Sequence, residues 1–203
     1  MNKKYKLLQD DTYELASGET LYRIRALRSF GDVKKGDLGS YIAGEHNLCH
    51  KGNAWVSGNA MVHGNARVSD NAQVLGDARV YGDARVFGDA AVYDDAEVYD
   101  DAWVFGFAQV YGRACVLDNA WVISNAEVYG KARVYGNAHV FNKAQVYNNA
   151  QVAGNAQVSG NARVYGNALV SGNARVYGDA QVHGGSLVYG DAQVHGNARI
   201  SSN

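Results

Sequence analysis

The segment Gly52-Asn53-Ala54-Trp55-Val56-Ser57 begins a six-residue repeat that decides the fold. The repeat continues as GNAMVH, GNARVS, DNAQVL and GDARVY, and it ends with GNARIS at 196–201. The 150 residues of 52–201 therefore form 25 consecutive hexads without an insertion. The third position is Ala in every hexad except one, which has Ser186, and the fifth is Val except for Ile200 in the last.

Each hexad is predicted to contain one short strand and one corner. Side chains alternate along an extended chain, so the Ala and Val of one hexad point to the same side. The first two positions are usually Gly followed by Asn or Asp, which are residues that accept a positive φ or form turns. A helix is disfavoured because a period of six does not match 3.6 and because Gly and Val recur throughout.

The pattern resembles the hexapeptide repeat of left-handed parallel β-helices, in which three hexads form one triangular coil of 18 residues. The resemblance implies an all-β, left-handed parallel β-helix of about eight triangular coils with an N-terminal β cap. At ~4.8 Å between stacked strands, the rod is roughly 40 Å long. This chain departs from the usual pattern at the sixth position, which is commonly Tyr or Phe here.

Residues 1–51 break the period and are predicted to form an N-terminal β-strand cap with an irregular first coil, before a solenoid domain at 52–203. Strands are expected at 5–8, 12–15 and 20–27, with turns at 9–11 and 16–18. Ile42 and Leu48 are expected to enter the first coil. The last hexad is followed directly by the chain end, so we expect that coil to dock on another subunit or the native chain to be longer.

The stretch RALRSFGDVKKGDLGSYI at 25–42, together with GNAWV at 52–56, is similar to the start of YdcK-type proteins. These are left-handed β-helix proteins of bacteria and phages that are usually classed as acyltransferase-like because of their fold. Fold alone does not establish chemistry. The resemblance implies side-by-side homo-oligomers, commonly trimers, and a role in host interaction for members carried by phages.

Composition excludes several classes of function. The formal net charge of -1 argues against nucleic-acid binding, which needs a local surplus of Lys and Arg. The N-terminus lacks the apolar run of a signal peptide, and no stretch approaches the ~18 apolar residues of a membrane span. Cys49 and Cys115 match no CxxC spacing and are expected to be free thiols in a reducing compartment. A cytoplasmic location is therefore expected.

Residues 18 apart stack in neighbouring coils, so the fourth and sixth positions of the hexads form ladders on three faces. We call them the first, second and third face, with hexads starting at 52, 58 and 64 and every 18 residues after each. The third face is predicted to be an interface between copies of the chain, in a trimer or dimer, because exposed aromatic patches usually mark contacts. Its residues are Phe87, Trp103, Phe105, Trp121, Ile123, His139 and Phe141. In the alternative, these stacked side chains merely support the sheet.

A ladder of tyrosines is expected on the first face. Cross-strand support of the sheet accounts for such a row, and a stacking platform for a ring-bearing small ligand is the functional alternative. The ladder consists of Tyr93, Tyr111, Tyr129, Tyr147 and Tyr165.

Acyl transfer on this fold needs a general base, usually His, and an acyl-donor pocket. His139 is the best-placed candidate base, although the loop and C-terminal helix that build the pocket in related enzymes have no counterpart in the sequence. The His46-x-x-Cys49-His50 cluster lacks a second ligand pair at zinc-site spacing. The acidic residues at the corners of the second and third coils are explained by turn formation as well as by calcium. No metal and no cofactor are therefore predicted.

These observations favour a non-catalytic β-solenoid that self-associates and binds a protein partner or a small ligand, for instance as a bacterial or phage factor that sequesters a host molecule. The alternative is a trimeric acyl-CoA-dependent acyltransferase with His139 as its base. The uninterrupted register favours the scaffold, because an extruded loop would be expected of the enzyme.

Overall fold

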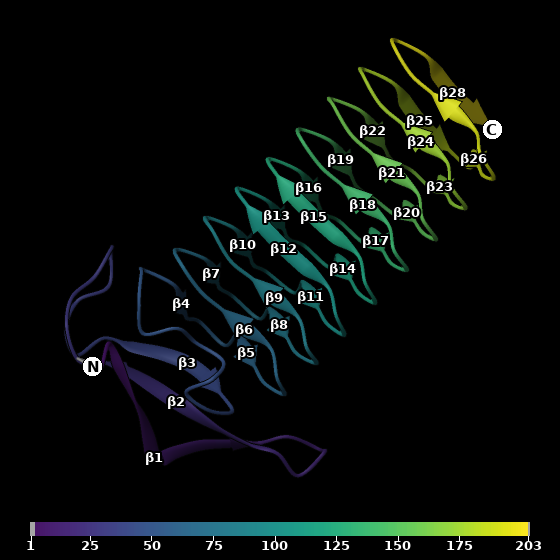
Figure 1. Cartoon of the computed structure of the whole chain (residues 1–203). Coiled ribbons are helices and arrows are strands. Elements are labelled where there is room, and N and C mark those ends of the chain that lie inside the picture. The colour runs from purple at the N-terminus through teal and green to yellow at the C-terminus, as the bar shows by residue number, and fades with distance from the viewer. Residues whose placement is uncertain (1–2, 203) are drawn as a thin grey trace.

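The structure is a computed structural model that describes residues 3–202 (Figure 1). Met1, Asn2 and Asn203 lie outside the described residues, and so do the expectations that concern them. A parallel β-solenoid of about nine turns follows a small antiparallel cap, and the described residues contain no helix. The predicted all-β solenoid is confirmed, and the structure is consistent with the expected left-handed winding.

Every hexad contributes one strand to one of three parallel sheets, and each strand pairs with the strand 18 residues away. Trp103, for example, is in register with Trp121, and Val104 with Val122. The first face consists of β4 (Trp55–Val56), β7 (Gln73–Val74), β10 (Ala91–Val92), β13 (Gln109–Val110), β16 (Glu127–Val128), β19 (Gln145–Val146), β22 (Arg163–Val164), β25 (Gln181–Gly184) and β28 (Arg199–Ser202). The second consists of β5 (Met61–Val62), β8 (Arg79–Val80), β11 (Glu97–Val98), β14 (Cys115–Val116), β17 (Arg133–Val134), β20 (Gln151–Val152), β23 (Leu169–Val170) and β26 (Leu187–Val188). The third consists of β6 (Arg67–Val68), β9 (Arg85–Val86), β12 (Trp103–Gly106), β15 (Trp121–Ser124), β18 (His139–Val140), β21 (Gln157–Val158), β24 (Arg175–Val176) and β27 (Gln193–Val194).

The core consists of the Ala and Val columns that the repeat predicts. These side chains are fully buried from Ala54 to Val182, apart from a trace of exposure at Val68. The small Ala next to each corner and the branched Val of each short strand fill a narrow triangular interior. Because every hexad supplies the same pair, the core is continuous along the axis.

The corners depend on the first hexad position, which adopts a positive φ. At Gly82 φ is +70°, and an added Cβ would lie 2.8 Å from the backbone nitrogen of Asp100. The same left-handed conformation occurs at the non-glycine residues Asp70, Asp94, Asp100, Asp118, Ser124, Asn142 and Asn148. The carboxylates of Asp70, Asp94 and Asp118 each accept a hydrogen bond from a glycine N–H in the next coil at 2.9–3.1 Å. Turn formation thus accounts for these acidic residues.

The cap consists of β1 (Tyr5–Glu14), β2 (Thr20–Ala26) and β3 (Leu38–Ile42). The predicted turn at 9–11 is wrong, because β1 runs through it with a register shift against β2 between Leu7 and Thr12. There Asp11 accepts a hydrogen bond from the hydroxyl of Tyr41 at 2.8 Å, so a strand irregularity takes the place of the turn. The turn at 16–18 is present.

The cap joins the solenoid through β3, which pairs with β5 in parallel. Ile42 and Leu48 are fully buried in the same core, as expected. Lys4 is also buried, with its Nζ donating a hydrogen bond to the carbonyl of Ala54 at 2.8 Å. Tyr5 donates one to the carbonyl of Leu48 at 2.8 Å. The cap is therefore anchored by polar groups as well as by apolar contacts.

The last coil is the most exposed part of the solenoid. Leu187 is 63% exposed and Tyr189 is 69% exposed, while Ile200 on β28 is 38% exposed. Docking of another subunit on this coil stays a prediction. Within residues 3–202, no helix is both long enough and apolar enough to cross a membrane.

Candidate functional site

The fourth positions of the third face form one continuous stacked column. The rings of Trp103 and Trp121 lie 5.2 Å apart with 9° between their planes, and Trp121 and His139 follow at 5.0 Å and 13°. At the other end, the guanidinium of Arg85 lies 5.0 Å from the centre of the Trp103 ring, in cation–π geometry. The column exists because strict 18-residue register places successive side chains directly above one another.

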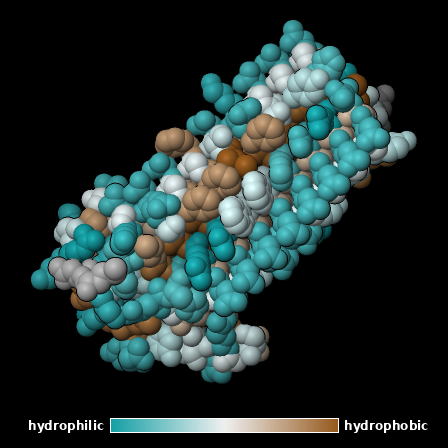
Figure 2. All heavy atoms as spheres, viewed as in Figure 1, coloured by the Kyte–Doolittle hydropathy of each residue, from teal (hydrophilic) through white to brown (hydrophobic). Residues whose placement is uncertain are grey.

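The sixth positions form a parallel apolar row beside that column. Phe87 and Phe105 stack at 4.6 Å, and Phe105 meets the edge of Trp121 at 6.2 Å. Ile123 and Phe141 continue the row, and all these side chains are half-buried. Polar residues, Ser69 and Ser159, occupy the same position on either side of the row. Figure 2 shows apolar surface gathered along the middle of the molecule, with hydrophilic surface around it.

Phe107 belongs to this apolar surface and was missed by the sequence reasoning. It follows Phe105 across Gly106 and is 61% exposed, the most exposed of the aromatic side chains on this part of the solenoid. Its position is the second of a hexad, which is otherwise a polar corner position and was therefore interpreted as turn chemistry. The available signal was that no other hexad has an aromatic residue there.

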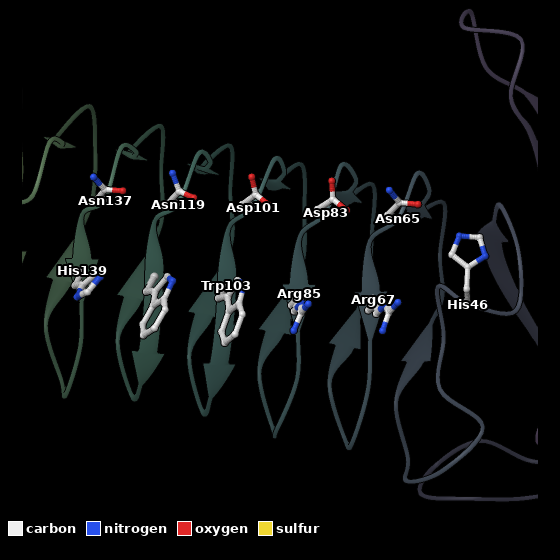
Figure 3. A pocket seen from close by; sticks show the side chains of 11 residues that line it. His46, Asn65, Arg67, Asp83, Arg85, Asp101, Trp103, Asn119, Asn137 and His139 are labelled. Atoms are coloured by element: carbon white, nitrogen blue, oxygen red, sulfur yellow. The ribbon is translucent and has the colours of Figure 1, made fainter.

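A groove of about 760 Å³ runs along the other side of the aromatic column (Figure 3). One row of side chains comes from the corner that precedes the third face: Asn65, Asp83, Asp101, Asn119 and Asn137. A second, parallel row comes from the strands: Arg67, Arg85, Trp103, Trp121 and His139. His46, from the irregular first coil, lies at one end.

Most polar side chains of this groove make no hydrogen bond to the rest of the protein, in contrast to the following part of the same corner; His46 and Asn137, at its two ends, are the exceptions among the described residues. Beyond the groove, an amide ladder runs from Asn137 to Asn155 and Asn173 and ends on Asp191, with hydrogen bonds of 2.9–3.1 Å. Between Asn65 and Asn137, the corresponding side-chain hydrogen bonds are absent among the described residues. Within residues 3–202, no hydrogen bond or ion pair engages the side chains of Asn65, Arg67, Asp83, Arg85, Asp101, Trp103, Asn119, Trp121 or His139.

The tyrosine ladder of the first face has a different geometry. Consecutive rings lie 4.8–4.9 Å apart and within 4° of parallel, from Tyr93 through Tyr111, Tyr129 and Tyr147 to Tyr165. Each inner ring face is therefore covered by a neighbouring ring. Several hydroxyls also donate hydrogen bonds to the next coil, as Tyr93 does to Gln109 at 3.0 Å. This arrangement favours support of the sheet, and ligand stacking on the ladder stays a prediction.

His139 has the position, but not the surroundings, of an oriented general base. Burial lowers the pKa of its imidazole, so the neutral form predominates at neutral pH. Stacking on Trp121 holds the ring, and within the described residues no carboxylate or carbonyl hydrogen-bonds it. A base in a hydrolytic or acyl-transfer site is normally oriented by such a third group.

The histidines and cysteine near the first coil are engaged separately. Nε2 of His46 lies 2.8 Å from the carbonyl of Gly64, and His63 lies 3.2 Å from a carboxylate oxygen of Glu19. His50 accepts a hydrogen bond from the backbone of Lys4. In the part of the chain that the structure describes, no three His, Cys, Asp or Glu side chains converge at metal-binding distance.

Three segments of the chain match the model of the YdcK beta solenoid repeat, at residues 78–94, 156–172 and 168–184. The chain therefore contains repeats of the YdcK β-solenoid type. No curated protein matches it significantly in sequence. The segments matched by the YdcK repeat model cover β8 to β10 and β21 to β25, so most of the aromatic column lies between them. The match therefore describes the repeat and assigns no activity to the third face.

Proposed function

We propose that this YdcK-type solenoid is a non-catalytic binding scaffold that self-associates through its third face. One observation carries the proposal: a band of half-buried and exposed aromatic side chains occupies the middle of one face, centred on Phe105 and the protruding Phe107. The same face becomes polar on both sides of the band, at Ser69 and Ser159. An apolar centre within a polar rim is the usual anatomy of a protein interface.

A second copy of the chain is the occupant that we propose for this band. Large aromatic side chains that protrude from an interface often contribute most of its binding energy. The band extends over the four coils from Phe87 to Phe141, and a matching band on a second solenoid would bury both along their lengths. A side-by-side arrangement of this kind leaves the groove at the opposite edge of the third face open.

An acyltransferase receives less support from the geometry. All strands from β4 to β28 recur at strict six-residue spacing, so no loop leaves the coils to form an acyl-donor pocket within 52–201. His139 lacks an orienting partner among the described residues. We therefore favour the scaffold, and a role in sequestering a host molecule is an extension of it.

The test is the molar mass in solution, measured by multi-angle light scattering. The native chain is expected to form a dimer or trimer of its 21.8 kDa unit. Phe107→Arg is expected to weaken association by about 30-fold or more, as the loss of an interface anchor worth ~2 kcal/mol does. Because Phe107 is mostly exposed, this substitution leaves the fold intact, which circular dichroism verifies.

The matched control is Leu187→Ser/Tyr189→Ser, which removes two equally exposed apolar side chains from the second face. This variant is expected to keep the native mass. A native protein that is monomeric at high micromolar concentration contradicts the proposal. An oligomer that only the control variant dissociates assigns the contact to the last coil instead.

A further inference from the structure

We propose that the groove of the third face binds an extended carbohydrate chain that lies along the solenoid axis. The inference concerns the edge of the face opposite to Phe107, and it holds whether the chain is a monomer or an oligomer. It is carried by the shape of the groove and by the hydrogen-bonding groups that the protein leaves unused there.

The groove is long, regular and open along its length. It crosses five consecutive coils, from Asn65 to Asn137 in one row and from Arg67 to His139 in the other. Successive side chains in each row are one coil apart, or ~4.8 Å. That interval is close to the length of one sugar ring in an extended chain, so each ring would meet the same pair of rows.

The unused groups are those that recognise hydroxyls. Asp83 and Asp101 supply acceptors, Arg67 and Arg85 supply donors, and Asn119 supplies both. A sugar hydroxyl also donates and accepts, and planar carboxylate, amide and guanidinium groups match two neighbouring hydroxyls at once. The two carboxylates of Asp83 and Asp101 lie on adjacent coils, where like charges repel each other. Hydroxyl donors from a ligand would relieve that repulsion.

A second groove on the same molecule shows that unpaired polar side chains are not common to all corners of the solenoid. It runs along the corner before the first face and is lined by Asn125, Glu127, Lys143, Gln145, Asn161, Arg163, Asp179 and Gln181. There Asn161 donates to Asp179 at 2.9 Å, Tyr111 to Glu127 at 3.3 Å and Tyr165 to Gln181 at 3.4 Å. Most of its polar groups are therefore paired within the protein, and it is not proposed as a site.

The chemistry of the groove disfavours other linear ligands. Two arginines and two aspartates cancel, so the groove lacks the surplus of positive charge that a nucleic acid needs. A peptide that binds by strand addition would need an open strand edge for its backbone. The solenoid presents none along this face, because backbone groups pair between coils, as Asp83 N does with the Asp100 carbonyl at 2.8 Å.

Tryptophan emission provides the readout. Trp103 and Trp121 lie in the groove, whereas Trp55, the only other tryptophan, is 4% exposed beneath the cap. The probes are cellohexaose, chitohexaose and a hexamer of mannuronate, which represent neutral, N-acetylated and acidic chains. At least one is expected to change the emission in a saturable way, with a dissociation constant below a few millimolar. The corresponding disaccharide is expected to bind at least tenfold more weakly, because it spans fewer coils.

Two substitutions test the assignment to the groove. Asp101→Asn and Asn119→Leu are each expected to weaken binding of the same hexasaccharide by about tenfold, the value of one hydrogen bond to a charged or planar group. Asn173→Leu, on the same corner but beyond the groove and without a hydrogen bond to a groove residue, is the control and is expected to leave binding unchanged. Circular dichroism confirms that each variant is folded, and the mass measured in the same samples reports self-association separately.

Three outcomes overturn the proposal: no saturable response to any of the three hexasaccharides, equal binding by the disaccharide, or unchanged binding by both groove variants. A response to a hexapeptide or an oligonucleotide in the absence of any response to the glycans also overturns it.

Discussion

The indole rings of Trp103 and Trp121 stack 5.2 Å apart, with 9° between their planes, on adjacent coils of the solenoid. Register alone brings them together, because the two residues are 18 apart in a repeat without insertions. The same stacking occupies the ring faces and leaves the edges for other contacts. The third face is therefore rigid before anything binds to it, which lowers the entropic cost of association.

The stack predicts an energetic coupling between the two tryptophans. In a double-mutant cycle of Trp103→Ala and Trp121→Ala, we expect a coupling of about 0.5–1.5 kcal/mol, the range of aromatic pairs. Urea unfolding followed by circular dichroism measures it. The pair Trp103→Ala and Tyr129→Ala, on different faces, is the control and is expected to be additive.

Replacing a corner glycine with alanine is predicted to lower the free energy of unfolding for two separate reasons, the left-handed backbone conformation and the close approach of the next coil. Gly82 and Gly190 both have a positive φ, +70° and +64°, but only at Gly82 would the new Cβ meet backbone of the next coil. Gly190→Ala is expected to cost about 1–2 kcal/mol for the left-handed conformation. Gly82→Ala is expected to cost clearly more, as measured by urea unfolding. Equal costs would show that the close approach of the coils is absent in solution.

Lys4 predicts a rise in stability with pH. Burial is the main cause that lowers the pKa of its amine, to about 8, with the charge of Arg28 acting in the same direction and Cys49 opposing it. The unfolded chain therefore binds this proton more tightly, so stability increases as the pH rises from about 8 to 10.5, by up to ~3 kcal/mol. Urea unfolding at pH 7.5 and 9.5 measures the change. Lys4→Met is expected to lose this pH dependence, and an unchanged slope in that variant would contradict the assignment.

The tyrosine ladder predicts the opposite trend at higher pH. Burial is the main cause that raises the pKa of Tyr93, Tyr111, Tyr129 and Tyr147. Neighbouring carboxylates or tyrosines add to it, and Arg163 opposes it at Tyr129 and Tyr147. The folded protein keeps these protons longer than the unfolded chain, so the ladder's contribution to stability is complete below pH ~10 and is lost as the pH rises further. Absorbance at 295 nm is expected to show tyrosinate formation at higher pH in the folded protein than in urea.

The sequence predicted the solenoid because its signal is local and repeated. Each Ala and Val pair defines an inward side, and the fixed period of six then places Trp103 beside Trp121 without further information. The turn expected at 9–11 failed for the opposite reason, because Gln9-Asp10-Asp11 has the composition of a turn while pairing with β2 keeps it in a strand. Pairing of that kind depends on residues distant in the chain.

Two parts of the third face were beyond the sequence reasoning. Phe107 occupies the second position of its hexad, where most residues form the turn, so the repeat pattern gave no reason to expect an apolar contact there. The groove's free polar groups depend on which asparagine side chains bond the equivalent residue in the next coil. Asn155 makes such a hydrogen bond, and Asn119 does not. Side-chain orientation decides that difference, and two asparagines at equivalent positions of the repeat are identical in sequence.

The most direct test of the central claim uses the five phenylalanines, of which Phe30 is 7% exposed in the cap and the others lie at or next to the third face. Fluorine NMR of protein labelled with 4-fluorophenylalanine, recorded during dilution, reports on all five at once. Self-association through the third face predicts that the signals of Phe105 and Phe107 shift and narrow on dilution while that of Phe30 stays in place. Five signals that are unchanged at every concentration, with the mass of a monomer, would contradict the account.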